Sequence, residues 1–135
     1  TVRKILTNND LQLVIGDLEA KRDWIHAYDV AMAAWISLQQ PDSDDYVISL
    51  NQYHSVRDTI QESFSVVGIN VEWELTKETG VEKETGRVLV TTNRELFRSY
   101  EIKTIALIGD NSKLLSRGWI PKYTWESMIR EMVLC

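Results

Sequence analysis

Cysteine is nearly absent from this sequence of 135 residues: the only one is Cys135, at the last position. An internal disulfide and a metal site made of several cysteines are therefore excluded. The six glycines form neither a Gly-x-Gly-x-x-Gly nor a Gly-x-x-Gly-x-x-Gly turn, so the chain does not encode a dinucleotide cradle. It also lacks a Gly-rich phosphate loop and the Gly-x-Ser-x-Gly turn of a nucleophilic serine. By these criteria the chain contains no recognisable catalytic residues.

Long apolar runs and excess positive charge are missing as well. The longest apolar run, residues 30–36, is far shorter than the ~20 residues that span a bilayer. Residues 1–10 lack the apolar core and cleavage site of a signal peptide, and we expect a cytoplasmic protein without membrane contact. The formal net charge of −5 argues against nucleic acid as a main partner, because phosphate backbones are bound by clustered lysine and arginine. The first residue is Thr1 rather than methionine, which indicates a fragment.

The composition is that of one globular domain, with 44% hydrophobic and 26% charged residues. Five tryptophans are many for this length, and several of them should be buried or line a pocket. His26 and His54 have no partners at metal-ligand spacing. We therefore expect no metal site and interpret both histidines as structural or surface groups.

The hydrophobic pattern predicts short strands mixed with several helices. Strands, marked by β-branched and alternating apolar residues, are predicted at 11–15, 46–50, 71–74 and 87–90. The charged stretch 77–86 is interpreted as a solvated loop. Helices are predicted at 29–39, from 55 to about 67, at 111–117 and from about 124. Without a strict βαβ repeat, the predicted fold class is a small α+β domain.

Three of these helices have informative details. The helix at 29–39 could be capped by Asp29 and is apolar nearly all round, so it should be buried. Ser55 and Asp58 predict a capping box at the start of the next helix. Its apolar stripe consists of Val56, Ile60, Phe64 and Val67, and the stripe of the last helix consists of Trp125, Met128, Ile129, Met132 and Val133.

Two arginines stand in contexts that suit an anion. Arg22 lies between a predicted strand and a predicted helix, and Arg57 lies in the first turn of a helix, where free N–H groups and the helix dipole favour negative charge. Two forked guanidinium groups would suit a diphosphate. The spacing alone leaves open a plainer interpretation, in which Arg22 pairs with Asp23 or Asp29 and Arg57 is solvated.

The chain resembles one family over nearly its whole length. Residues 16–27, Asp29 and residues 32–35 closely resemble the "LGNLDAKRDWGHA-x-D" segment of GDP-mannose 4,6-dehydratases, which belong to the extended short-chain dehydrogenase/reductase group. Further family motifs are matched, in order, by residues 1–5 ("FVTRKI"), 54–58 ("HSVRE"), 84–90 ("TG-x-V"), 98–101 ("RPTE"), 109–122 ("GD-x-x-K-A-x-x-x-LGWKPK") and 128–133 ("LVREMV"). The Arg-Asp-Trp and Ser-Val-Arg motifs together make the resemblance specific.

The resemblance implies that residues 1–135 are the small C-terminal GDP-sugar-binding portion of such an enzyme, without its N-terminal Rossmann domain. The family converts GDP-mannose to GDP-4-keto-6-deoxymannose, on the route to GDP-fucose and other deoxysugars. Its NADP and its catalytic residues belong to the Rossmann domain. We therefore expect this chain to be an incomplete lyase that is inactive alone, and the full-length enzyme to be a homo-oligomer.

The family's binding residues can be carried over position by position. Arg22 and Arg57 would contact the diphosphate of the GDP-sugar. Glu101 would bind the ribose hydroxyls, with Arg98 beside it. The residues implied to lie near the guanine are Lys4, Gly16 and Leu18.

Some positions depart from the family pattern. Ile25 replaces a glycine, Ser99 replaces a proline, and Asp58 is one methylene shorter than the family glutamate. These departures leave two alternatives open: a degenerate, non-catalytic nucleotide-sugar-binding or regulatory module, and a related dehydratase or epimerase that acts on another nucleotide sugar.

Overall fold

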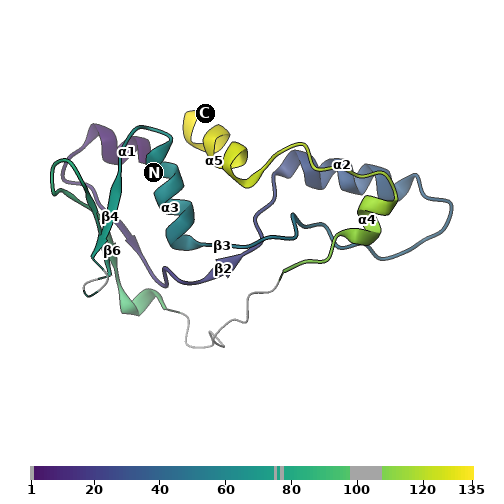
Figure 1. Cartoon of the computed structure of the whole chain (residues 1–135), viewed down its shortest axis with the longest axis horizontal. Coiled ribbons are helices and arrows are strands. Elements are labelled where there is room, and N and C mark those ends of the chain that lie inside the picture. Colours follow the sequence, from purple (N-terminus) through teal and green to yellow (C-terminus); the bar gives the residue numbers. More distant parts are fainter. Residues whose placement is uncertain (1, 75, 77, 98–107) are drawn as a thin grey trace. The chain divides into compact units, whose positions relative to one another are not determined.

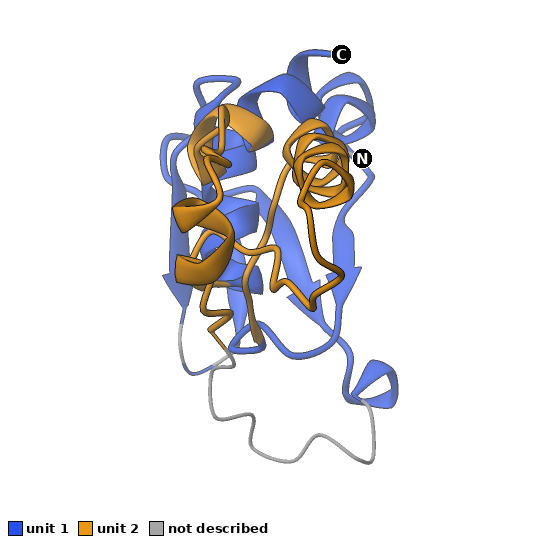
Figure 2. Cartoon of the chain, turned by 90° about the vertical axis from the view of Figure 1, so that its right-hand side faces the viewer, with its two compact units in different colours: residues 1–20, 55–104, 129–135 blue, residues 21–54, 105–128 orange. Residues whose placement is uncertain are grey.

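The computed structural model describes residues 2–74, 76, 78–97 and 108–135 (Figure 1). The chain divides into two compact units, each assembled from separate stretches of sequence (Figure 2). Unit 1 comprises residues 1–20, 55–104 and 129–135, and unit 2 comprises residues 21–54 and 105–128. Each unit has its own hydrophobic core.

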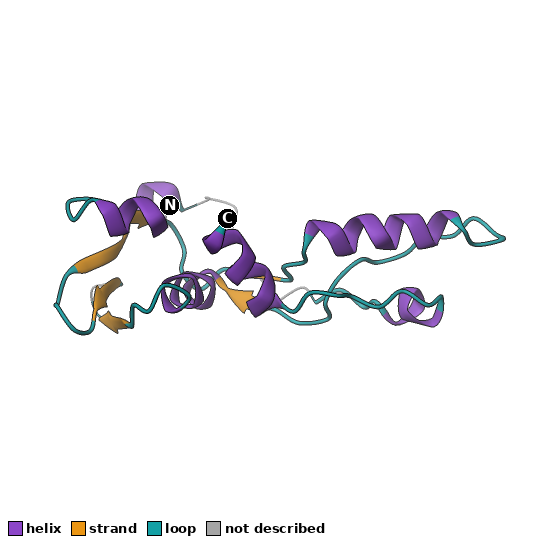
Figure 3. Cartoon of the chain, turned by 90° about the horizontal axis from the view of Figure 1, so that it is seen from above, coloured by secondary structure: helices purple, strands orange, loops and turns teal. Residues whose placement is uncertain are grey.

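Helices and short strands are mixed along the chain without a strict βαβ repeat, as the sequence predicts for an α+β fold (Figure 3). The helices are α1 (Val2–Thr7), α2 (Ala27–Leu38), α3 (Val56–Ser65), α4 (Ser112–Ser116) and α5 (Trp125–Leu134), with the 3₁₀ helix η1 at Arg94–Leu96. The strands are β1 (Leu13–Ile15), β2 (Lys21–Arg22), β3 (His54–Ser55), β4 (Val71–Glu74), β5 (Thr79–Glu82) and β6 (Val88–Thr92).

Unit 1 contains a four-stranded sheet in the order β1-β6-β5-β4. β1 runs parallel to β6, with Leu13 opposite Val90, and the other neighbours are antiparallel. The core of the unit combines residues of α1, α3 and β6 with one residue of the loop after β1: Ile5, Ile60, Phe64, Leu89, Val90 and the loop residue Leu18.

Strand β5 corrects the prediction that residues 77–86 form a solvated loop. Residues 83–85 form a turn, after which the Gly86 N–H donates to the Glu82 carbonyl at 2.8 Å, and Gly86 has a φ of 72°. Residues 79–82 instead form β5, which pairs with β4 and β6 at once, and Gly80 is buried beneath Trp73. The two neighbouring strands supply hydrogen-bond partners for the β5 backbone on both sides, and this stabilises a strand despite the charged composition of the segment.

The predicted helix with a capping box is confirmed as α3. The Ser55 hydroxyl accepts from the Asp58 N–H at 3.0 Å, and the Asp58 carboxylate accepts from the Ser55 N–H at 2.8 Å. Ile60 and Phe64 of the predicted stripe are buried in the core of unit 1. The reciprocal cap fixes the start of this helix, and with it the position of Arg57.

In unit 2 the core is formed by Ala33, Leu114 and Trp119. The prediction of a strand at 46–50 is wrong, because these residues have no regular secondary structure. Their backbone is held by side chains instead: Asn111 donates to the Ser49 carbonyl at 2.9 Å, and the Leu50 N–H donates to Asp23 at 2.9 Å. Side-chain partners take the hydrogen bonds that a neighbouring strand would supply.

Two predictions about α2 are also corrected. The residue that caps it is His26, whose Nδ1 accepts from the Tyr28 N–H at 3.0 Å, whereas Asp29 lies inside the first turn. The helix is also not buried: Trp35 is 60% exposed and Leu38 is 80% exposed, and only Asp29 and Ala33 are buried. An all-apolar helix surface predicts burial, but the described residues do not cover it.

The two C-terminal helices agree with prediction in place and largely in burial. α4 lies within the predicted range 111–117, and α5 begins at Trp125. Trp125, Met128 and Ile129 are buried, whereas Met132 of the predicted stripe is 69% exposed.

Candidate functional site

Arg57 lies in the first turn of α3, as the sequence predicts. The expectation that free N–H groups there could hold an anion is wrong, because all four of the first-turn N–H groups have protein acceptors. The N–H groups of Val56 and Arg57 donate to the carbonyls of Ala20 and Leu18. Those of Ser55 and Asp58 donate to each other's side chains in the capping box. Any anion at this place must therefore be bound by the Arg57 side chain and not by the helix backbone.

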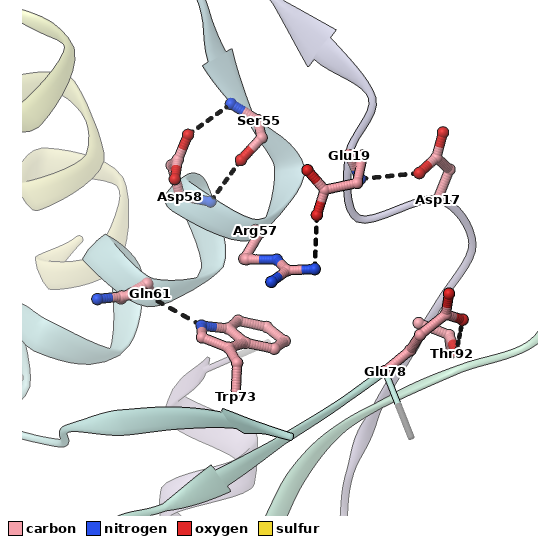
Figure 4. Close-up of polar contacts among 9 residues, drawn as sticks. All are labelled: Asp17, Glu19, Ser55, Arg57, Asp58, Gln61, Trp73, Glu78 and Thr92. Atoms are coloured by element: carbon pink, nitrogen blue, oxygen red, sulfur yellow. Dashed lines mark hydrogen bonds and ion pairs between the residues drawn. The ribbon is translucent and has the colours of Figure 1, made fainter. Parts of the chain in front are cut away.

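Among the described residues, the Arg57 guanidinium has one acidic partner and one aromatic partner (Figure 4). Its NH2 group lies 2.5 Å from the Glu19 carboxylate, and its Cζ lies 5.2 Å from the centre of the Trp73 ring. Trp73 comes from β4 and is itself oriented by a hydrogen bond from its Nε1 to Gln61 of α3, at 3.1 Å. The Arg57 Nε is buried and has no hydrogen-bond partner among the described residues.

Glu19 contacts Arg57 from the loop between β1 and β2. Its backbone N–H donates to the Asp17 carboxylate at 2.8 Å, which fixes the loop at this point. The side chain of Glu19 is 65% exposed, whereas that of Arg57 is only 22% exposed. The arginine is thus the anchored member of the pair, and the glutamate is the member that can rotate into solvent.

A small pocket of about 50 Å³ lies beside this ion pair. It is lined by Asp17, Leu18, Glu19, Arg57, Glu78, Thr92 and Phe97. Three of these side chains are acidic and one is basic, which disfavours an anion unless that anion carries more charge than a carboxylate. Pockets for drug-sized ligands are usually ~300–1,000 Å³, so this one has room for a single polar group of a larger ligand.

Glu78, the third acid of the pocket, directly precedes β5. Its φ of 50° is unusual for a residue with a side chain, and its carboxylate accepts from the Thr92 hydroxyl at 3.1 Å. That hydrogen bond ties Glu78 to β6 rather than to Arg57 (Figure 4).

The other predicted site residues are placed as follows. Arg22 belongs to unit 2, where it is exposed in β2 and donates from NH1 to the Lys21 carbonyl at 2.7 Å. The plainer interpretation, in which Arg22 pairs with Asp23 or Asp29, is wrong within the described part of the chain: one Asp23 oxygen accepts from the Leu50 N–H and the other is buried without a hydrogen-bond partner, and both Asp29 oxygens accept from backbone N–H groups. A solvated Arg57 is likewise excluded by its pair with Glu19. The joint role of Arg22 and Arg57 stays a prediction.

The three residues predicted near the guanine all lie in unit 1. Leu18 lines the pocket and also belongs to the core, while Lys4 is exposed on α1 and does not line the pocket. Gly16 is buried, and a Cβ atom there would lie 2.9 Å from the Leu96 carbonyl oxygen, so close packing alone explains a glycine. Their role as guanine contacts stays a prediction. Glu101, Arg98 and Ser99 lie outside the described residues.

Four residues around Arg57 were missed by sequence reasoning: Glu19, Trp73, Glu78 and Thr92. Glu19 lies inside a recognised motif, three residues before Arg22, and its acidic side chain was the available signal that an arginine of the site could have an ion-pair partner. Trp73 and Thr92 come from strands whose register brings them near α3, and that register cannot be read from a single segment.

The histidines have structural contacts. The His54 ring stacks on Trp125 with 3.7 Å between ring centres, and His26 stacks on Tyr123 at 3.9 Å. Among the described residues there is no group of three or more His, Cys, Asp or Glu side chains that could hold a metal ion. In the same part of the chain, none of the helices has the length and apolar character required to cross a bilayer.

Comparison with known proteins identifies similar sequences. The family model described as GDP-mannose 4,6 dehydratase matches residues 1–132. The chain is 44% identical over 123 residues to a GDP-mannose 4,6-dehydratase of Sordaria araneosa, covering 89% of this chain and 22% of that protein. It is 38% identical over 122 residues to the GDP-mannose 4,6 dehydratase of Homo sapiens, covering 88% of this chain and 32% of that protein. The chain thus spans about a fifth to a third of these curated relatives.

Solved structures show the same fold. The structure of RMD from Pseudomonas aeruginosa complexed with NADPH matches with a TM-score of 0.73 and 17% identity, covering 98% of this chain and 38% of that one. The UDP-glucose 4-epimerase of Thermus thermophilus complexed with NAD matches with a TM-score of 0.59 and 19% identity, covering 98% of this chain and 37% of that one. At these identities the likeness concerns the fold, which supports the mixed α and β architecture.

Proposed function

The chain belongs to the GDP-mannose 4,6-dehydratase family, and from this premise we propose that it is the GDP-sugar-binding part of an enzyme that dehydrates GDP-mannose. The observation that carries the proposal is Arg57. Its guanidinium is held by Trp73, with an Nε that lacks a partner among the described residues, beside a pocket sized for one polar group. Such an arginine is suited to a phosphate oxygen, because a guanidinium donates paired hydrogen bonds to phosphate.

The proposed binding mode assigns one role to each part of the ligand. Arg57 and Arg22 bind the diphosphate, and Lys4, Gly16 and Leu18 lie near the guanine. Glu101 accepts hydrogen bonds from the two ribose hydroxyls, with Arg98 beside it. In this scheme the chain orients the nucleotide sugar and does not carry out proton or hydride transfer.

NADP would supply the hydride chemistry of the complete enzyme, but the residues of this chain do not fit that cofactor. No three of the six glycines, at positions 16, 68, 80, 86, 109 and 118, have the spacing of a dinucleotide-binding turn. We therefore assign NADP to an N-terminal Rossmann domain, and expect lyase activity and homo-oligomers only of a protein that includes it.

The proposal is tested by ligand binding to this chain and to two arginine variants. Thermal-shift titrations with GDP, GDP-mannose, dTDP and NADP should raise the melting temperature with the two guanine nucleotides alone. Arg57→Ala and Arg22→Ala should each weaken GDP binding by about 30-fold, since a charge-assisted hydrogen bond contributes roughly 2 kcal/mol. Arg130→Ala, an exposed arginine of α5, is the matched control and should bind GDP as the wild type does.

Two outcomes would overturn the proposal. Unchanged GDP affinity in both arginine variants would show that neither Arg22 nor Arg57 contacts the diphosphate. A stabilisation by dTDP equal to that by GDP would favour a related enzyme of another nucleotide sugar.

The second candidate function is a non-catalytic nucleotide-sugar-binding or regulatory module. The observation in its favour is the acidic lining of the Arg57 pocket by Asp17, Glu19 and Glu78, which weakens any anion site. The departure at Ile25 does not favour it, because Ile25 packs against the core of unit 2. A folded sample that no nucleotide stabilises would support the regulatory form of this alternative, whereas nucleotide binding without activity in a full-length enzyme would support the nucleotide-sugar-binding form.

A further inference from the structure

Glu19 occupies a side of Arg57 that a bound phosphate group would need. Its carboxylate lies 2.5 Å from the Arg57 NH2, within reach of a charge-assisted hydrogen bond. The NH2 group is on the forked end of the guanidinium, which is the end that binds phosphate in pairs of hydrogen bonds. A phosphate oxygen and the Glu19 carboxylate therefore compete for the same donor.

The pair is built so that only one member moves. Arg57 is fixed by the capped first turn of α3 and by the Trp73 ring beneath its guanidinium. The Glu19 backbone is fixed by its N–H bond to Asp17, but its side chain is 65% exposed, and Arg57 is its ion-pair partner among the described residues. Rotation of that side chain into water breaks a single ion pair and leaves the backbone unchanged.

We propose that Glu19 is a specificity-determining residue, whose carboxylate holds Arg57 in the ligand-free protein and yields it more readily to an anion of higher charge than to a monoanion. This inference rests on the proposed function of Arg57 as a phosphate ligand. A carboxylate or another monoanion gains little by replacing Glu19, because the exchange is nearly symmetric. A diphosphate carries more charge on more oxygens and so displaces the glutamate.

The solvent exposure of Glu19 sets how strongly its carboxylate can compete with a diphosphate for Arg57. Ion pairs with a solvent-exposed member are weak, so the competition of Glu19 should lower the affinity for a diphosphate by about two- to fivefold. Repulsion between the displaced carboxylate and the bound phosphate acts in the same direction. Removing the charge at position 19 should consequently strengthen binding, which is the opposite of what loss of a ligand-binding residue does.

The test measures GDP affinity by isothermal titration calorimetry for the wild type, Glu19→Gln, Arg57→Ala and the double variant. Glu19→Gln should bind GDP about two- to fivefold more tightly than the wild type. In the Arg57→Ala background the same substitution should have a clearly smaller effect, because there is no guanidinium to compete for. Glu19→Gln should also increase binding of monoanionic acetate, measured as competition with GDP.

Glu78→Gln distinguishes competition from a general change of charge. Glu78 lines the same pocket, but its hydrogen bond is to Thr92 and not to Arg57. Its neutralisation should therefore strengthen GDP binding less than that of Glu19 does. An equal gain in the two variants would show that only the overall pocket charge matters, and would overturn the inference.

The inference and the proposed function fail in different ways. If Arg57→Ala weakens GDP binding while Glu19→Gln leaves it unchanged or weakens it, Glu19 does not compete, and the proposed phosphate ligand stands. If Arg57→Ala binds as the wild type does, Arg57 is not a phosphate ligand and the inference fails, and if Arg22→Ala is unchanged too, or if no form of the chain binds GDP, the proposed function fails with it.

Discussion

Asp29 offers a direct test of what holds unit 2 together. Its side chain is 1% exposed, and its two carboxylate oxygens accept from the backbone N–H groups of Lys122, at 2.8 Å, and Tyr123, at 3.0 Å. Its carbonyl accepts from the Trp119 indole N–H at 3.1 Å. One residue thus connects the start of α2 to residues 119–123, which lie far along the sequence.

Asp29→Asn should destabilise the protein by about 2–3 kcal/mol. An asparagine has one side-chain oxygen, so it can accept from only one of the two N–H groups, and its NH₂ group faces the other. One charge-assisted bond is lost and a partly buried N–H is left without an acceptor. The favourable contact of a negative charge with the first turn of α2 is lost as well, at roughly 0.3–1 kcal/mol, and is included in that range.

The assay is urea unfolding followed by tryptophan fluorescence and by circular dichroism. The matched control is Asp42→Asn, at an exposed position of the same unit, where the midpoint should stay at the wild-type value. An Asp29→Asn midpoint that coincides with that of Asp42→Asn would refute the reasoning. It would mean that the two N–H groups find other acceptors when the carboxylate is changed.

Two further predictions concern other parts of the chain. Gly16→Ala should lower the stability of unit 1 by about 1–3 kcal/mol, because the added Cβ would lie 2.9 Å from the Leu96 carbonyl oxygen, and an unchanged melting temperature would contradict this. The hydrogen bond and ion pair with Lys113, together with the Asp45 N–H, lower the pKa of Asp44. This contact therefore stabilises the folded chain above the ordinary pKa of an aspartate, and the contribution is lost as the pH falls through the lowered value. In an NMR titration of the carboxyl group, Lys113→Met should raise the Asp44 midpoint towards the ordinary value, and an unchanged midpoint would contradict the assignment.

Local patterns predicted where α2, α3, α4 and α5 lie, because such signals lie within a few residues, but they did not predict α1. The capping box of Ser55 and Asp58 and the buried pair Ile60 and Phe64 were all readable from spacing. Strand β5 was missed because its stability comes from two neighbouring strands and not from its own composition. The strand predicted at 46–50 failed for the reverse reason: its residues favour a strand, but no strand lies beside it in the described structure.

The candidate site was only partly predictable. Arg57 was found because its motif and its place in a helix are both visible in the sequence. Its environment was not, since Trp73, Glu78 and Thr92 reach the site through the sheet and Glu19 through a loop. The satisfied first turn of α3 also depends on the carbonyls of Leu18 and Ala20, which belong to a distant stretch of the chain.

The interleaved composition of the two units has a consequence for folding during synthesis. Unit 1 needs residues 1–20 to pair with residues 55–104, as β1 does with β6, and it also includes the stretch 129–135. The Arg3 side chain donates at 2.9 Å to each of the carbonyls of Leu134 and Cys135, so these contacts can form only after both residues have left the ribosome. Because long-range pairings must close large loops, the chain should fold slowly for its size and depend on chaperones more than a protein with local contacts does.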